Sequence, residues 1–168
     1  MSFSLIPDCV FNDYHAVTPE LLRVRGIRLL LCDLDYTLAP KAQGEPDAAL
    51  RDWVRMLADA GVTVEIVSNN RSPRRVERFC GTLGIGYTGH AGKPGTRGLR
   101  QAMAKHGAAA AQTAMLGDKL LTDTLAAKRA GVLMLMVEPK GGPVGAWNHC
   151  LHAMQEPFKR ACGRDERG

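Results

Sequence analysis

Short apolar runs alternate with amphipathic segments along most of this chain. The runs are rich in leucine, methionine and β-branched residues, as expected of strands that are buried on both faces of a sheet. They span residues 27–33, 62–67, 85–87, 113–117 and 132–137. The segments between them place apolar side chains at helical spacing, over residues 46–60, 72–83, 94–106 and 121–130.

The alternation of strand and helix favours an α/β fold. We predict a Rossmann-like, doubly wound sheet of five mostly parallel strands, with helices on both faces. At 168 residues the chain fits one domain, 1–168, with a core over about residues 21–140. We expect an N-terminal extension, 1–20, and a C-terminal helix at about 144–160 to pack on this core.

Composition and charge narrow the class of protein modestly. The hydrophobic fraction is 45% and the charged fraction is 23%, as in ordinary globular proteins. The net charge of +5 suits an anionic substrate or an acidic membrane surface, and we expect no nucleic acid partner. The five cysteines form no close-spaced pair, so neither a disulfide framework nor a cysteine-rich zinc site is indicated. Without a membrane-spanning run or a signal peptide, the expected location is cytoplasmic.

Acidic and small polar side chains follow two of the predicted strands. Asp33 and Asp35 come directly after the first apolar run, and alternate side chains of an extended segment share a face. Such a pair of carboxylates either binds a cation or shares a proton, or else lies solvated in a loop. Ser68 and Asn69 follow the second run, where they suit a phosphate oxygen but are also common turn residues.

Two further loops carry a cation and a second acidic pair. Lys93 lies at the entry to a predicted helix, either to neutralise a phosphoryl group or as an ordinary surface charge. Asp118 and Asp123 follow the run at 113–117, where carboxylates bind magnesium or cap a helix. Because doubly wound sheets bind ligands at the carboxyl ends of their strands, we expect these loops to form one site.

Taken in order, the loops resemble the four motifs of the haloacid dehalogenase (HAD) superfamily, which are DxDxT, a Ser or Thr, a Lys, and GDxxxD. The matching residues are Asp33-Leu34-Asp35-Tyr36-Thr37, Ser68, Lys93, and Gly117-Asp118 through Asp123, at intervals of 35, 25 and 25 residues. With Leu5–Asp8, Arg25-Gly26-Ile27, Ser68-Asn69-Asn70 and Lys93-Pro94, the chain is similar to the YqeG family of subclass III phosphatases over about residues 5–137. Tyr36 departs from the family pattern, which usually has Asn there, so flap contacts or substrate preference can differ.

The resemblance implies a Mg²⁺-dependent phosphomonoester hydrolase that works through an aspartyl-phosphate intermediate. Asp33 is the implied nucleophile. Asp35 is the implied general acid, and then the general base for the water that hydrolyses the intermediate. Lys93 completes the implied catalytic set by offsetting the accumulated negative charge.

The same resemblance implies how phosphate and metal are held. Ser68, Asn69 and Lys93 are the implied phosphate-binding residues. The implied Mg²⁺ ligands, of which one is a backbone carbonyl, belong to Asp33, Asp35, Asp118 and Asp123.

The intervals between the motifs leave no room for a cap domain. Only 30 residues separate Thr37 from Ser68, and 24 separate Ser68 from Lys93, so each interval is mostly used by one core helix. The YqeG family is similar to the mitochondrial phosphatase that converts phosphatidylglycerophosphate to phosphatidylglycerol. An open site therefore favours a phosphorylated lipid head group, with peripheral contact at the inner face of the membrane.

Two alternatives remain for the activity. The first is a soluble phosphatase of a sugar phosphate, nucleotide or phosphoprotein, whose site is completed by a neighbour in a homo-oligomer. The second, less favoured, is a non-catalytic binding module on the same fold. The presence of every motif residue argues against the second.

The predicted C-terminal helix also has two interpretations. One face carries four apolar residues, Trp147, Leu151, Met154 and Phe158, beside the cations Lys159, Arg160 and Arg164. An interfacial helix would direct these cations to acidic lipids. A helix that covers the sheet and ends in a frayed basic tail is the interpretation that we favour.

Overall fold

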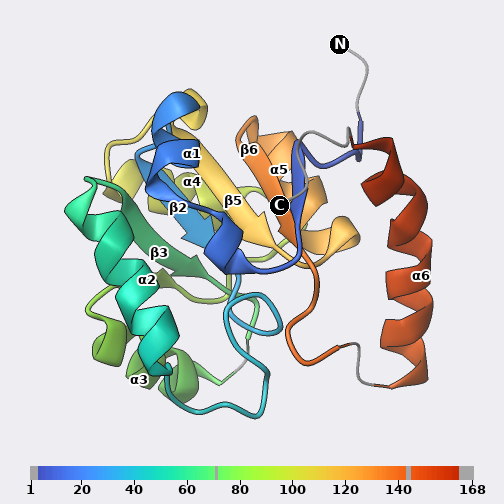
Figure 1. The fold of residues 1–168 in the computed structure, drawn as a ribbon, viewed down its shortest axis with the longest axis horizontal. Helices are drawn as coiled ribbons and strands as arrows, with labels where there is room; N and C mark the ends of the chain where they lie inside the picture. Colours follow the sequence, from blue (N-terminus) through green and yellow to red (C-terminus); the bar gives the residue numbers. More distant parts are fainter. Residues whose placement is uncertain (1–3, 71, 143–144, 163–168) are drawn as a thin grey trace.

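The computed structural model describes residues 4–70, 72–142 and 145–162, which centre on one sheet (Figure 1). The strands run in the spatial order β1-β6-β5-β2-β3-β4, and every neighbouring pair is parallel. They are β1 (Cys9–Phe11), β2 (Leu29–Cys32), β3 (Thr63–Val67), β4 (Gly86–Thr88), β5 (Thr113–Gly117) and β6 (Leu133–Val137).

The predicted α/β doubly wound fold is confirmed, but the predicted number of strands is wrong. A sixth strand, β1, pairs with β6 at the sheet edge, in the register Cys9↔Leu135 to Phe11↔Val137. Three residues are too few to show a strand period, and their pairing depends on a partner more than a hundred residues away in the chain. The N-terminal segment therefore contributes to the sheet itself rather than only packing on it.

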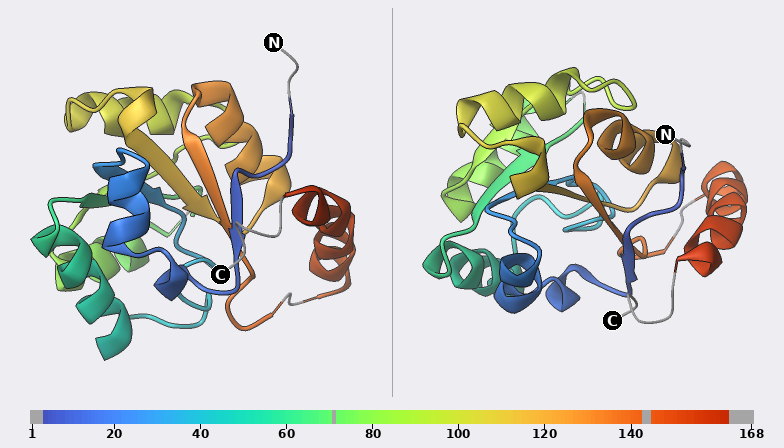
Figure 2. Two further views of the ribbon diagram at one scale, coloured as in Figure 1. Left: turned by 45° about the horizontal axis from the view of Figure 1, so that its top comes forward. Right: turned by 90° about the horizontal axis from the view of Figure 1, so that it is seen from above.

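Helices cover both faces of the sheet (Figure 2). One face carries α1 (Pro19–Val24), α2 (Ala48–Asp59) and α3 (Pro73–Leu83), and the other carries α4 (Arg97–Lys105) and α5 (Leu125–Ala130). Alternate strand residues serve the two layers, since Leu30 and Cys32 belong to the first core and Leu29 and Leu31 to the second. Short turns of helix occur at Tyr14–Ala16 and Ala110–Gln112, and a π-helix at Leu120–Thr124 leads into α5.

Helix α2 illustrates how the sequence determines the local structure. Asp47 caps its first turn, because the carboxylate accepts a hydrogen bond from the Leu50 backbone N–H at 2.8 Å. Its inner face buries Leu50, Trp53, Val54 and Leu57. The indole N–H of Trp53 donates to the Val17 carbonyl at 3.0 Å, which ties the N-terminal segment to this layer.

The sheet topology determines where a ligand site can form. From β2 the chain proceeds to β3 and β4 on one side, and later to β5 and β6 on the other side. The loops that leave β2 and β5 therefore diverge from neighbouring strands, which is the switch point where doubly wound folds bind ligands. Asp33 and Asp118 are the first residues of these two loops.

The C-terminal helix, α6 (Ala146–Ala161), lies at the margin of the molecule in all three ribbon views. Its buried residues are polar: Gln155 accepts from the Leu120 backbone N–H at 3.0 Å, and the Lys159 ammonium lies 2.7 Å from Glu138. Trp147 and Met154 are 74% and 55% exposed. Leu151 and Phe158 are half-buried, and Phe158 packs against the second core, so only part of the apolar face of α6 is exposed.

Two expectations for this region fall on residues that the structure does not describe. The predicted start of the helix at about 144 and the basic tail residue Arg164 lie outside the described residues. None of the helices within the described part of the chain combines the length and the apolar run that crossing a bilayer demands.

Candidate active site

Three buried carboxylates meet at the switch point of the sheet. Carboxylate oxygens of Asp33, Asp118 and Asp123 lie within 4.8 Å of one another. Asp33 is held in place by its backbone N–H, which donates to the Leu116 carbonyl at 2.9 Å and extends the pairing of β2 with β5. The ammonium of Lys93 lies between two of the carboxylates, 2.8 Å from Asp33 and 2.6 Å from Asp123.

The three buried carboxylates carry more negative charge than the nearby ammonium groups neutralise. Burial raises the pKa of Asp118 to about 7, since the nearby Lys119 ammonium only partly opposes burial and the charges of Asp123 and Asp33 add to it. Burial also raises the pKa of Asp123, against the effect of Lys93. The Lys93 pKa is raised in turn, because Asp123 and Asp33 together outweigh the effect of its own burial. Crowded, buried carboxylates of this kind fit a divalent cation.

Gly117 allows the two acidic residues of the last motif to approach each other. A Cβ atom at Gly117 would lie 2.5 Å from the Cβ atom of Asp123, closer than real side chains pack. The Asp123 carboxylate also accepts from the backbone N–H of Lys119 at 3.1 Å. The glycine of GDxxxD is thus required for the position of Asp123 rather than for turn conformation.

Two neighbouring side chains orient Asp118. The hydroxyl of Thr37 donates to Asp118 at 3.1 Å, so the first motif contacts the last one. The ammonium of Lys119 lies 3.0 Å from the same carboxylate oxygen, and 5.4 Å from the ring centre of Tyr36. A hydroxyl and an ammonium group thus hold the Asp118 carboxylate.

The polar residues after β3 connect two motif loops. The hydroxyl of Ser68 is buried and accepts from the backbone N–H of Asn70 at 3.0 Å. The side-chain amide of Asn69 donates to the Lys93 carbonyl at 2.8 Å and accepts from the Lys93 backbone N–H at 3.0 Å. Asn69 thereby holds the lysine loop in position, and its binding of phosphate stays a prediction.

The carboxylate of Asp35 is held at both oxygens. The guanidinium of Arg75 lies 2.5 Å from one oxygen, and the side-chain amide of Asn70 donates to the other at 2.8 Å. Asp35 is only 17% exposed at its side chain. Together with Asp33 and Asp123, it lines one pocket.

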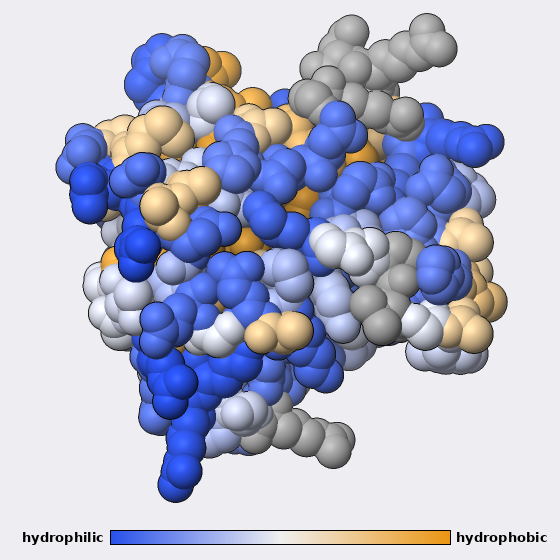
Figure 3. Space-filling model, turned by 60° about the horizontal axis from the view of Figure 1, so that its bottom comes forward, coloured by the Kyte–Doolittle hydropathy of each residue, from blue (hydrophilic) through white to orange (hydrophobic). Residues whose placement is uncertain are grey.

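The predicted residues surround one pocket of about 700 Å³. Its lining includes six of the seven, namely Asp33, Asp35, Ser68, Asn69, Lys93 and Asp123. Asp118 contacts the same cluster and lines the adjacent small cavity beside α6. Figure 3 views the molecule with the bottom of Figure 1 turned forward; hydrophilic residues dominate this view, and hydrophobic ones appear in separate patches.

Sequence reasoning missed two cations of the site, Arg75 and Lys119. Lys119 directly follows Asp118, so its position in the motif was available as a signal. Arg75 is harder to find, because three arginines lie close together in α3. Its spacing of four residues from the buried Phe79 places it on the inward side of the helix, and its guanidinium lies 5.9 Å from the Phe79 ring centre.

Two solved phosphatases have a similar fold. The cobalt-bound deoxy-D-mannose-octulosonate 8-phosphate phosphatase of Haemophilus influenzae matches with a TM-score of 0.54 at 22% identity, covering 83% of this chain and 93% of that one. The 3-deoxy-D-manno-octulosonate 8-phosphate phosphatase of Moraxella catarrhalis, solved with magnesium and phosphate ions and the sugar acid, matches at 0.51 and 17% identity, covering 86% and 94%. The fold and the four-loop site define a HAD-type phosphatase.

Sequence comparison identifies the family within the HAD superfamily. The HAD-hydrolase-like family matches residues 90–139. A Bacillus subtilis protein described as a probable phosphatase, YqeG, is 34% identical over 137 residues, which is 82% of this chain and 78% of the relative. The chain belongs to the YqeG family of the HAD superfamily, as its motifs predicted.

Proposed function

We propose that the protein is a Mg²⁺-dependent phosphomonoester hydrolase that forms an aspartyl-phosphate on Asp33. The observation that carries this proposal is the buried cluster of Asp33, Asp118 and Asp123 around the Lys93 ammonium. A carboxylate nucleophile needs nearby positive charge to approach an anionic phosphate group. Three carboxylates face two ammonium groups, those of Lys93 and Lys119, so the cluster keeps a net negative charge that favours a bound cation.

Two proton-balanced steps follow from these positions. In the first, a carboxylate oxygen of Asp33 bonds to phosphorus, the ester P–O bond breaks, and protonated Asp35 gives its proton to the leaving oxygen. In the second, Asp35 takes a proton from water while the water oxygen bonds to phosphorus and the bond to Asp33 breaks. Asp35 thus regains the proton that it donated.

The remaining residues bind and neutralise the phosphoryl group. Ser68 lies in the pocket wall to contact a phosphate oxygen, with Asn69 beside it. Lys93 offsets charge at the nucleophile and at the transferring group. Asp33, the Asp35 carbonyl, Asp118 and Asp123 would hold Mg²⁺, which supplies charge neutralisation and orientation of the phosphate. The magnesium-bound relative supports this choice of metal.

Phosphate release by the purified protein tests the activity. We expect p-nitrophenyl phosphate hydrolysis that requires Mg²⁺ and stops when the metal is chelated. Asp33→Asn keeps the size of the side chain but removes the nucleophilic oxygen anion, so turnover should fall by roughly 10³-fold or more. Turnover by Asp33→Asn close to that of the wild type would contradict the proposal.

We propose further that the substrate is a phosphorylated lipid head group, with phosphatidylglycerophosphate the first candidate. An apolar groove adjoins the catalytic pocket, and the two share Lys119 and Thr122 in their walls. The other groove residues are mostly apolar: Leu5, Leu120, Leu121, Leu151, Met154, Gln155 and Phe158. A polar pocket beside an apolar groove suits a molecule that has a phosphate at one end and hydrocarbon at the other.

A charged side chain introduced into the groove tests whether the substrate is a phosphorylated lipid. Met154→Glu should lower kcat/KM for phosphatidylglycerophosphate in mixed micelles by roughly tenfold, since a carboxylate there opposes both hydrocarbon and the anionic lipid surface. Hydrolysis of glycerol phosphate should change less than about twofold. Met56→Glu is the matched control, because Met56 is 40% exposed on α2 and outside the groove. Equal loss on both substrates, or a wild-type preference for the small ester, would contradict the lipid proposal.

A further inference from the structure

Arg75 is a half-buried cation whose closest contact is the proposed acid and base, Asp35. Its side chain is 15% exposed, and its Nη1 atom lies 2.5 Å from Asp35 Oδ1. Asn70 donates to the other oxygen of the same carboxylate at 2.8 Å. Both oxygens of Asp35 are therefore held by fixed donors.

The position of Arg75 is itself fixed by the backbone. Its Nε and Nη2 atoms donate to the Gln43 carbonyl at 3.2 and 2.9 Å, and Nη2 also donates to the Pro40 carbonyl at 3.3 Å. The guanidinium lies 5.9 Å from the ring centre of Phe79 on the same helix. Arg75 thus connects the regular helix α3 to the loop after β2, and presents a separate N–H to Asp35.

We propose that Arg75 is a positioning residue for proton transfer. It holds the Asp35 carboxylate at the pocket wall, so that the proton passes between Asp35 and the leaving oxygen or water in a fixed direction. This inference rests on the proposed function of Asp35. It goes beyond the family motifs, because Arg75 belongs to none of the four.

The nitrogen atoms of the Arg75 guanidinium have different partners, and this difference supports the proposal. Anchoring the loop at Pro40 and Gln43 uses Nε and Nη2. Nη1 is directed instead to Asp35. The carboxylate pairs the charge of the guanidinium, and in return the guanidinium fixes the direction of the carboxylate, on which proton transfer depends.

The leaving group provides a readout that a merely structural role would not change. Glycerol phosphate expels an alkoxide that must receive a proton, whereas p-nitrophenyl phosphate expels a stable anion that needs none. We expect Arg75→Gln to lower the ratio of kcat/KM for glycerol phosphate to kcat/KM for p-nitrophenyl phosphate by about tenfold or more. The ratio is measured on one preparation, so a partly unfolded sample does not alter it.

Three variants complete the experiment. Arg78→Gln, an exposed arginine on the same helix, should leave the ratio at the wild-type value. Arg75→Lys, which keeps the charge but not the fork of donors, should recover part of the loss. Asp35→Asn should lower the ratio by itself, and Arg75→Gln should add little to it in the double variant, because both act through one carboxylate.

The failure of this inference is distinct from the failure of the proposed function. If Arg75→Gln lowers both kcat/KM values equally, or if its effect adds fully to that of Asp35→Asn, Arg75 is a structural anchor and the inference is overturned. If the wild type lacks Mg²⁺-dependent turnover, or Asp33→Asn retains it, the proposed function itself fails.

Discussion

At the scale of single residues, Tyr36 shows how the chain accommodates its departure from the family pattern. Its backbone has φ of 67°, in the left-handed region, where asparagine is favoured over most other residues. Its carbonyl accepts from the Lys140 backbone N–H at 2.6 Å, and its N–H donates to the Ala39 carbonyl at 2.8 Å. These bonds hold the conformation, and the ring gains contact with the Lys119 ammonium.

The backbone strain at Tyr36 predicts a difference between two variants. Tyr36→Asn and Tyr36→Ala both remove the ring, but only asparagine adopts the left-handed conformation readily. We expect the asparagine variant to be the more stable by about 1 kcal/mol in the free energy of unfolding, measured by urea denaturation. Equal stabilities, or a more stable alanine variant, would show that the conformation of this residue carries no strain.

The close contact of Gly117 with Asp123 leads to a second prediction about a single residue. Gly117→Ala introduces a methyl group into the space of Asp123, so the carboxylate cluster must shift. We expect kcat/KM to fall by about 10²-fold and the Mg²⁺ concentration for half-maximal activity to rise, since small displacements in a site are costly. Gly81→Ala is the control, because its Cβ atom would meet nothing within 4 Å. An unchanged Mg²⁺ requirement in Gly117→Ala would contradict this account.

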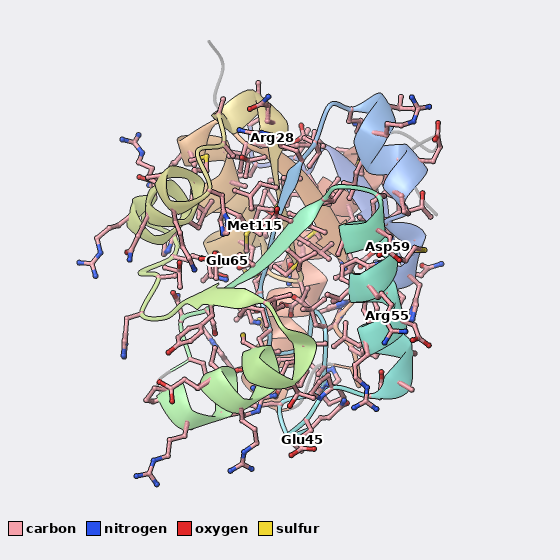
Figure 4. The ribbon with its side chains drawn as sticks, turned by 90° about the vertical axis from the view of Figure 1, so that its left-hand side faces the viewer. Arg28, Glu45, Arg55, Asp59, Glu65 and Met115 are labelled. Carbon is pink, nitrogen blue, oxygen red and sulfur yellow. The ribbon has the colours of Figure 1, made fainter. Side chains whose placement is uncertain are left out.

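At the scale of elements, one buried carboxylate joins two strands to a helix. Glu65 of β3 is labelled in Figure 4, where it lies beside α4. It accepts from the Thr88 hydroxyl at 2.6 Å, contacts the His106 ring, and lies 3.0 Å from the Lys105 ammonium. Burial would raise the pKa of Glu65, but these hydrogen bonds and the charge of Lys105 outweigh it and lower the pKa.

The lowered pKa of Glu65 predicts a pH-dependent stability. Its contribution is fully present above the unfolded value of about 4.5, and is lost as the pH falls below that value through the lower folded pKa. Glu65→Gln should therefore be less stable than the wild type at neutral pH, and the difference should shrink below pH 4.5 in urea denaturation. Exposed Glu45→Gln, the control, should show no such change. A difference that stays constant with pH would contradict the role of Glu65.

The elements also show the limits of sequence periodicity. The strand predicted at 113–117 is found at Thr113–Gly117, and the helix predicted at 72–83 is found at Pro73–Leu83. Both carry enough residues to show a pattern. β1 does not, and α6 buries Gln155 and Lys159 because their partners, Leu120 and Glu138, come from other parts of the chain. Such pairings depend on tertiary structure, which a local pattern does not contain.

At the scale of the whole molecule, the parallel topology explains why four separated motifs form one site. The strands end on one side of the sheet, so the loops after β2, β3 and β5 meet there, together with the Lys93 loop. The order of residue types was therefore enough to predict this meeting. Arg75 was not predictable in the same way, because its role depends on the loop carbonyls of Pro40 and Gln43.

The catalytic pocket also has an apolar neighbour, the groove beside α6. The catalytic pocket and the groove beside α6 share Lys119 and Thr122 in their walls, so the C-terminal helix lies near the site although it is at the margin of the fold. Leu121 and Met154, both exposed, stand at this border. Met154 of α6 and Leu121 are exposed in the wall of the groove and are available for a substrate, which is the basis of the lipid proposal.

The most direct test of the central claim is to trap the phosphoryl group on the protein. Asp35→Asn should still transfer phosphate from p-nitrophenyl phosphate, whose leaving group needs no proton, but lacks the base for hydrolysis of the intermediate. After acid quenching, mass spectrometry of peptides should find one phosphoryl group on the peptide that contains Asp33, and none when Asp33→Asn is added. A phosphoryl group on another residue, or rapid phosphate release without Asp33, would contradict the account.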